Sequence, residues 1–185
     1  MTYAEFALDC VGFDTASGRL EVRRDGEEFV MDFPLIRTSP YPVTDVLRRA
    51  VGSEIVDASI GYRDPIVLLK TPEEVRDLKP DMAAVEALPD GLGLFVTAPG
   101  YSGYDFVSRA FWPKIRIPED PVCGSMHCSL ADFWMKRTGK TVMVGKKVSA
   151  RGGTVGVKVH GERVEITGRA ALFAVFEVGD GVLEI

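Results

Sequence analysis

The segment Glu119–Lys140, EDPVCGSMHCSLADFWMKRTGK, carries the strongest signals for the fold of this chain. Apolar residues stand at the helical positions i, i+4, i+7 and i+8 of its second part: Met126, Leu130, Phe133 and Trp134. The basic pair Lys136–Arg137 suits the last turn of such a helix, and Gly139 suits its C-cap. The segment therefore predicts a helix over 125–139.

The ten residues Glu119–Cys128 also concentrate chemistry, since they include two adjacent acids, two of the three cysteines and one of the two histidines. Gly124 and Ser125 stand where the loop turns into the predicted helix. The first amides of a helix lack partners within it and favour negative charge, so this pair is a candidate cradle for a carboxylate or phosphate. The alternative is that Ser125 is an ordinary N-cap.

The adjacent acids Glu119 and Asp120 repel each other, which in a dry site raises one pKa into a range useful for proton transfer. A solvated turn is the alternative. Cys123 stands beside the candidate cradle, where a helix N-terminus lowers the pKa of a thiol; otherwise it is a small buried residue. His127 is either an acid–base group or a helix residue with satisfied hydrogen bonds.

Cys128 is expected to pack in the core. The spacing of Cys123, His127 and Cys128 does not converge on zinc, so no metal site is expected.

Outside this segment, a mixture of strand and helix signals surrounds the predicted helix. Two short β runs flank the turn pair Asp25–Gly26, and Pro34 ends the second run. Thr71 and Pro72 open a helix that Pro80 splits. Another helix is expected over 43–51, and further strands over 55–62, 65–70, 91–98, 104–111, 141–145, 153–168 and 171–178.

Helices and strands do not alternate strictly, so an α+β domain with a curled sheet wrapped on a helix fits better than a doubly wound sheet. Two regions are expected, a strand segment over 1–34 and a second domain over 35–185. The two regions can pack together as one domain.

Composition narrows the function classes. With 185 residues, 46% hydrophobic and 26% charged, the chain suits a folded domain with a sizeable core. A net charge of −5 argues against nucleic acid as a partner. The odd number of cysteines, three, favours reduced thiols in a cytoplasmic protein. The first residues lack the basic and apolar regions of a secretory signal, and no apolar run is long enough to span a membrane, so no membrane association is expected.

Two stretches resemble the second half of the phenazine-biosynthesis PhzF-like family: DFVSRAFWPKIRIPEDPVCGSMHCSLADFWMKRTGK and SARGGTVGVKVHGERVEITGRA. The match runs from about Tyr104 to Ala170. The stretch FDTASGRLEVRRDGEEFVMDFP, residues 13–34, resembles the strand pair that leads into the crossover between the family's halves.

The resemblance implies one half of a diaminopimelate-epimerase-like fold, a curved mixed sheet or barrel around a central helix. It implies a biosynthetic isomerase that shifts a proton on a small carboxylate, with no cofactor and no metal. Asp120 matches the family's acid in EDP, which assists proton transfer. Gly124 and Ser125 match the pair that holds the substrate carboxylate, and His127 lies in the same binding segment.

Two departures qualify the resemblance. The family's first-half signatures GNP, the SETAF-like segment with its general-base glutamate, and GHAT do not occur in this sequence. Cys123 replaces the usual threonine, and CGSM imperfectly echoes the CG[ST]G motif of diaminopimelate epimerase and proline racemase, with Met126 in place of glycine.

Three hypotheses follow. The first is a PhzF-like isomerase, or the C-terminal half of one, with Asp120 in proton transfer. The second is a thiol-based racemase in which Cys123 is catalytic and has a depressed pKa. The third is a non-catalytic half-length fragment that binds a small anion or serves in dimerisation. In each case exposed apolar surface predicts a homodimer. The sequence does not identify the substrate.

Overall fold

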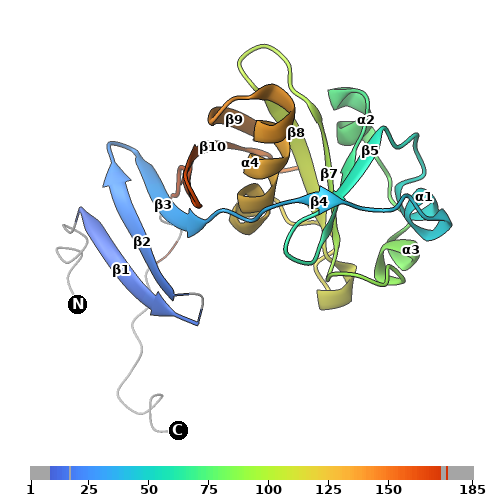
Figure 1. The fold of residues 1–185 in the computed structure, drawn as a ribbon, viewed down its shortest axis with the longest axis horizontal. Helices are drawn as coiled ribbons and strands as arrows, with labels where there is room; N and C mark the ends of the chain where they lie inside the picture. The colour runs from blue at the N-terminus through green and yellow to red at the C-terminus, as the bar shows by residue number, and fades with distance from the viewer. Residues whose placement is uncertain (1–8, 17, 172–173, 175–185) are drawn as a thin grey trace, which may run out of the picture.

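The computed structural model describes residues 9–16, 18–171 and 174 (Figure 1). The strands in these residues are β1 (Cys10–Thr15), β2 (Gly18–Asp25), β3 (Glu28–Pro34), β4 (Ser39–Pro40), β5 (Asp57–Ile60), β6 (Pro65–Leu68), β7 (Leu94–Pro99), β8 (Phe106–Phe111), β9 (Val142–Lys147), β10 (Gly153–His160) and β11 (Arg163–Gly168). The helices are α1 (Asp45–Val51), α2 (Pro72–Asp77), α3 (Met82–Glu86), α4 (Gly124–Thr138) and the 3₁₀ helix η2 (Pro113–Ile115). None of these helices is long and apolar enough to cross a membrane.

All the described strands join one sheet in the order β1-β2-β3-β11-β10-β9-β8-β7-β6-β5-β4. Neighbouring strands are antiparallel except in two pairs, β6–β7 and β8–β9, which are parallel. The fold is therefore the expected mixed α+β architecture, and it differs from a doubly wound sheet, in which parallel pairs dominate. Strands from the region before residue 35 enter the same sheet through the pairing of β3 with β11.

The two faces of the sheet carry two separate cores. Along β7, Phe95 belongs to the core that contains α4, whereas Leu94 and Val96 belong to the core that contains α1, α2 and α3. This alternation follows from the strand, whose successive side chains point to opposite faces. The helix α4 thus packs on one face, and the three short helices pack on the other (Figure 1).

Local sequence signals place most element ends where they were expected. Thr44 caps α1, and Gly52 ends it in the left-handed conformation. Thr71 and Glu74 form a capping box at the start of α2. The helix α4 begins one residue earlier than predicted, at Gly124, and ends at the expected Gly139. Most of the strand expected over 171–178 lies outside the described residues.

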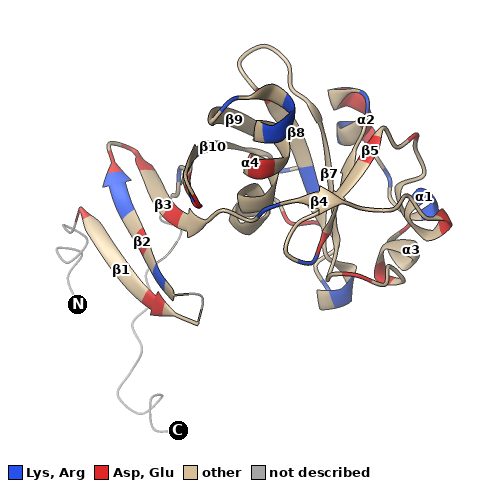
Figure 2. Cartoon of the chain, viewed as in Figure 1, with Lys and Arg blue, Asp and Glu red and all other residues tan. Residues whose placement is uncertain are grey.

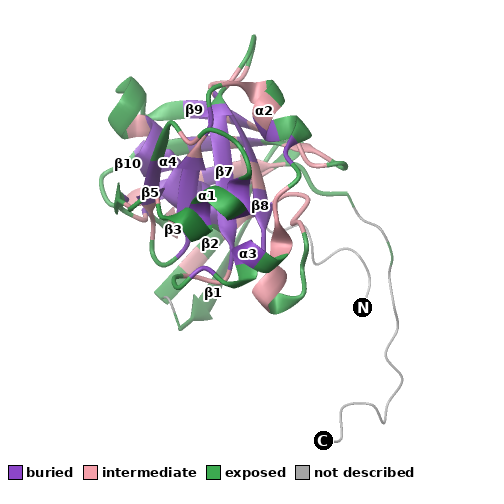
Figure 3. Cartoon of the chain, turned by 90° about the vertical axis from the view of Figure 1, so that its right-hand side faces the viewer, coloured by how far each residue is buried: buried purple, intermediate pink, exposed green. Residues whose placement is uncertain are grey.

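The apolar face that packs on α4 continues past the helix onto β2 and β1. Ile166, Met31, Val22 and Val11 are register partners across β11, β3, β2 and β1, so they form one row on a single face. Ile166 is buried, whereas Val11 and Phe13 in β1 are 39% and 50% exposed. Figure 3 shows the same gradient, from buried α4 and β7 to exposed β1. The described part of the chain leaves the outer end of this face uncovered.

The surface of the outer strands carries interspersed charges. Basic residues of β2 lie near acidic residues at the ends of β1 and β3 (Figure 2). Arg23 pairs with Glu165 at 3.2 Å and with Asp25 at 3.6 Å. Exposed pairs of this kind contribute little stability, so the sheet depends on its apolar face.

A buried carboxylate anchors α4 to the connection between β3 and β4. Asp132 is fully buried, and its Oδ2 accepts hydrogen bonds from the amide and the hydroxyl of Thr38, both at 2.7 Å. Its Oδ1 accepts from Arg37 Nη1 at 3.1 Å, and Lys136 Nζ lies 2.7 Å from Oδ2. Burial opposes the charge, but the hydrogen bonds from Lys136, Thr38 and Arg37 outweigh it and lower the pKa of Asp132.

We expect Asp132→Ala to destabilise the protein by about 3–5 kcal/mol at pH 7, because it leaves buried donors without an acceptor. Because its folded-state pKa is depressed, Asp132 stabilises the fold above the unfolded-state value of about 4. That contribution is lost as the pH falls through the lower folded-state pKa. Denaturant unfolding at pH 7 and at pH 3 measures both effects.

The matched control is Asp14→Ala, which removes a carboxylate that is 87% exposed, and its unfolding midpoint should equal that of the wild type. Equal midpoints for Asp132→Ala and Asp14→Ala would contradict the anchoring role.

Candidate active site

The amino end of α4 has no side-chain cap. Cys123 occupies the N-cap position with φ −95° and ψ 113°, and its side chain makes no capping hydrogen bond of the kind that a Ser, Thr, Asp or Asn oxygen provides. Ser125 is the second residue of the helix, so the interpretation of Ser125 as the N-cap is wrong. Because a helix leaves its first amides without backbone partners, this end can accept an anion.

The two adjacent acids before the helix have different partners. Glu119 makes a two-point ion pair with Arg109, at 2.7 and 2.9 Å. The Asp120 amide donates to the Ala110 carbonyl at 3.0 Å, and Asp120 Oδ1 accepts from the Val122 amide at 3.0 Å. Glu119 is thus held by a cation, and half-buried Asp120 shapes the turn into α4.

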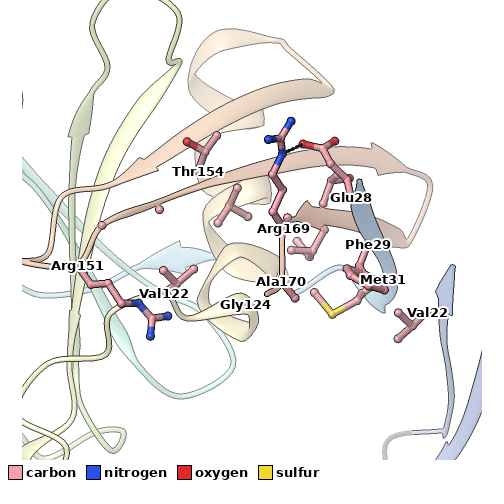
Figure 4. Close-up of a pocket in the computed structure, with 16 residues that line it drawn as sticks. Val22, Glu28, Phe29, Met31, Val122, Gly124, Arg151, Thr154, Arg169 and Ala170 are labelled. Atoms are coloured by element: carbon pink, nitrogen blue, oxygen red, sulfur yellow. Dashed lines mark ion pairs between the residues drawn. The ribbon is translucent and has the colours of Figure 1, made fainter. Parts of the chain in front are cut away.

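A groove of about 910 Å³ opens beside this helix end. Its lining residues come from β2, β3, β10, β11 and the segments next to α4 and β10: Val22, Glu28, Phe29, Met31, Val122, Gly124, Arg151, Gly152, Gly153, Thr154, Val155, Ile166, Thr167, Gly168, Arg169 and Ala170. In Figure 4 the Arg151 side chain extends toward Val122 and the start of α4. Most of the lining is apolar; Arg151 lies near the helix end, and Arg169 pairs with Glu27 and Glu28 farther along the groove (Figure 4).

Gly124 is the predicted site residue that lies in the groove. A Cβ built on Gly124 would meet no atom within 4 Å, so the backbone here faces open space. Ser125 is exposed next to it. Gly124 thus lines the groove, whereas Ser125, the next residue of the helix, and Asp120, in the preceding turn, are not among its lining residues.

His127 belongs to α4, and its side chain is buried in the protein and does not line the groove. It is fully buried, and its Nδ1 lies 2.6 Å from the Cys123 carbonyl oxygen, to which it donates a proton. Burial first, and the charge of Lys147 second, lower the pKa of His127 to about 3. The buried ring holds the N-cap carbonyl and does not line the groove, and substrate binding by His127 stays a prediction.

Cys123 does not have the depressed pKa that a thiol base requires. Its side chain is buried, and its Sγ lies 3.3 Å from Ser125 Oγ. Burial raises the pKa of Cys123 more than the contacts with Ser125 and the Met126 amide lower it. Cys128 packs in the core as expected, and burial raises its pKa to about 12.

Two cationic side chains near the site were not singled out from the sequence. Arg151 follows β9 and lies at the groove. Lys147 ends β9 and is fully buried on the α4 side, where its Nζ lies 3.3 Å from Met126 Sδ. One sequence signal could have indicated the burial of Lys147: it alternates with Met143 and Gly145, and alternate residues of a strand share a face.

Within residues 9–16, 18–171 and 174, no group of three or more His, Cys, Asp or Glu side chains could hold a metal ion.

Comparison with known proteins identifies the family and the fold of this chain. The family model of the phenazine biosynthesis-like proteins, PhzC-PhzF, matches residues 4–175. A Pseudomonas aeruginosa protein named as an uncharacterized isomerase is 44% identical over 163 residues, which cover 88% of this chain and 61% of the relative. The human phenazine biosynthesis-like domain-containing protein is 33% identical over 178 residues, which cover 86% of this chain and 62% of the relative. The chain thus spans about three fifths of the length of these relatives.

Solved structures show the same fold. A PhzF family protein of Enterococcus faecalis superposes with a TM-score of 0.87 at 41% identity, covering 93% of this chain and 65% of that protein. A PhzC/PhzF protein of Clostridium difficile superposes with a TM-score of 0.85 at 36% identity, covering 95% and 68%. By sequence and by fold, this chain belongs to the PhzC/PhzF family of phenazine biosynthesis-like proteins.

Proposed function

We propose that this protein acts as a PhzF-like isomerase that shifts a proton on a small carboxylated metabolite, without a cofactor. The observation that carries this proposal is the uncapped amino end of α4, which opens at Gly124 into a groove lined by apolar residues and Arg151. The isomerase name of the 44% identical relative supports the same reaction class.

In this proposal the substrate carboxylate binds the amides of Gly124 and Ser125. The helix dipole favours a negative charge at this position, and Arg151 adds a full positive charge nearby. The carbon skeleton then lies against the apolar lining formed by Val22, Phe29, Met31, Val122 and Ile166. A compact carboxylate with an aliphatic or aromatic body fits this combination.

Asp120 is the proton-transfer group that this chain supplies. Its Oδ1 is held by the Val122 amide, whereas no hydrogen bond within the described residues engages Oδ2. Oδ2 removes a proton from carbon, leaving a carbanion whose charge spreads into the adjacent carboxylate. For the proton to return to a different carbon, the carbanion must also be conjugated with a C=C bond of the substrate: the proton is added to the far carbon of that bond, the double bond shifts toward the carbon that lost the proton, and Asp120 is regenerated. The helix end and Arg151 stabilise the charge that develops in the transition state.

We further propose that the curved sheet around α4 is one half of a diaminopimelate-epimerase-like fold. A second copy would then cover the exposed face that carries Val11 and Phe13, giving a homodimer. Sedimentation at micromolar concentration tests this, and a monomer would contradict it.

The second candidate function is binding of a small anion without catalysis. The observation in its favour is that this chain spans 61% of the length of the P. aeruginosa relative, so groups that complete catalysis there can lie in the remaining part.

We expect the full-length chain, incubated in heavy water with a panel of small carboxylates, to incorporate deuterium at a carbon-bound position of its substrate. Asp120→Asn should lower the exchange rate at least about 100-fold, because an amide does not take up the proton. Proton NMR of the recovered acids measures the exchange.

Cys123→Ser separates this mechanism from thiol-based racemisation, since it should keep most of the exchange. Exchange that survives Asp120→Asn but disappears in Cys123→Ser would transfer the role to the thiol. Anion binding with no exchange for any acid would favour the non-catalytic candidate.

Gly124→Ala places a methyl group in the groove. Because no atom lies within 4 Å of this position, the variant should fold with a melting temperature equal to or above that of the wild type. The methyl group should nevertheless crowd the carboxylate and raise its Kd about 10-fold or more, a loss of about 1.4 kcal/mol. Calorimetric titration and thermal unfolding measure the two effects, and unchanged affinity would contradict the assigned binding position.

A further inference from the structure

Lys147 is a buried cation without an acidic hydrogen-bond partner. Its side chain is fully buried at the end of β9, and its Nζ contacts the Met126 thioether sulfur at 3.3 Å. A thioether is a weak acceptor, so it compensates poorly for the loss of water around an ammonium group. Such an arrangement destabilises the folded protein. Destabilising arrangements of this kind are expected mainly at functional sites.

Two further polar atoms in this region are also buried without a hydrogen-bond partner. They are Nε2 of His127, in the first turn of α4, and Oγ of Ser108, which is the register partner of Lys147 across β8 and β9. Neither group supplies the negative charge that would balance an ammonium. The charge of Lys147 is therefore not neutralised by a direct ion pair within the described residues.

The position of this charge relates it to the candidate active site. Met126, which the ammonium contacts, is the third residue of α4, so Nζ lies at the first turn of the helix. The ionisable groups that act on it electrostatically include Cys123, Asp120 and Glu119, which surround the amino end of α4. The ammonium thus lies behind the same helix end whose amides open into the groove.

We propose that Lys147 is a positioning residue of the anion site, whose buried ammonium strengthens the binding of a carboxylate at the amides of Gly124 and Ser125. This inference rests on the proposed carboxylate site. It assigns to Lys147 the charge that sets how tightly the site binds a carboxylate. The ammonium does not touch the ligand. It acts through the low-dielectric interior, where a charge is screened less than at the surface.

The same charge acts on His127, which burial already keeps neutral. Burial first, and the neighbouring ammonium second, disfavour imidazolium, while the hydrogen bond from Nδ1 to the Cys123 carbonyl favours it and is made in either protonation state. The carbonyl belongs to the N-cap residue, so its position fixes the direction of the first amides.

A dependence on pH follows from the groups around Lys147. Burial lowers the pKa of Lys147 to about 8, although Cys123, Asp120 and Glu119 oppose this and Arg109 reinforces it. A bound carboxylate favours the charged form, so the affinity is full below the pKa of the free protein and falls as the pH rises above it.

The other groups that face Lys147 do not produce this change. His127 stays neutral because its pKa is about 3, and burial raises the pKa of Cys123 above its ordinary value. Carboxyl and guanidinium groups in general keep their charge near pH 8.

The test uses benzoate as the probe and benzamide as its uncharged counterpart, with the full-length chain. Amide NMR shifts of Gly124 and Ser125 report binding in the wild type, Lys147→Met and the matched control Lys158→Met. Lys158 is an exposed residue of β10, 59% accessible, and its replacement changes the net charge equally.

We expect Lys147→Met to weaken benzoate binding at pH 7 about tenfold, whereas Lys158→Met changes it little. In the wild type the affinity should fall between pH 7.5 and pH 9.5, and in Lys147→Met it should be constant over that range. The melting temperature of Lys147→Met should equal or exceed that of the wild type, because methionine fills the same space without a buried charge.

A merely structural role predicts the opposite pattern, with a lower melting temperature and an unchanged, pH-dependent affinity, and that result would overturn the inference. If benzoate binds the wild type but Lys147→Met binds it equally at every pH, the inference fails while the carboxylate site stands. If benzoate leaves the Gly124 and Ser125 amides of the wild type unshifted, or if benzamide shifts them equally, the carboxylate site fails and the inference fails with it.

Discussion

The rest of the structure depends on a helix that is buried along most of its length but uncapped at its amino end. Residues 126–134 of α4 are buried, and packing against the sheet fixes the helix in place. Asp132 anchors it to the connection after β3, and His127 holds the carbonyl of its N-cap residue. The first amides therefore have little freedom to turn inward, and with no side-chain cap they remain available to water or to a ligand. A fixed set of donors of this kind binds an anion at low cost in conformational entropy.

The electrostatics of the groove are local and do not follow from the net charge of the chain. The net charge is −5, and yet the region around the amino end of α4 gathers Arg151, Lys147 and the positive end of the helix dipole. Glu119 does not cancel this charge, because Arg109 binds it in a two-point ion pair. Asp120 is left as the acid nearest the helix end with an oxygen that no described residue engages. In the proposed mechanism, this arrangement separates Asp120, which would transfer the proton, from the groups that would bind the carboxylate.

Short-range chemistry accounts for the features that could be predicted from the sequence. The N-caps Thr44 and Thr71, the split at Pro80 and the C-cap Gly139 are decided by neighbours a few residues away, and the element ends follow them closely. The order of the strands in the sheet depends on contacts between residues more than a hundred positions apart, such as β3 with β11, which no local pattern reveals.

The site was predicted less completely, for the same reason. The position of Gly124 at a helix start followed from spacing. The burial of His127 and the raised pKa of Cys123 depend instead on how α4 packs against the sheet, and local patterns left both alternatives open for each residue. Lys147 was missed because a lysine at a strand end is usually exposed.

The most direct test of the central claim is a crystal structure of the full chain grown with benzoate. The account predicts a carboxylate whose oxygens lie about 3 Å from the amide nitrogens of Gly124 and Ser125, with the ring against the apolar wall of the groove. A carboxylate bound elsewhere, with the amides of the first helical turn directed into the protein interior, would contradict it.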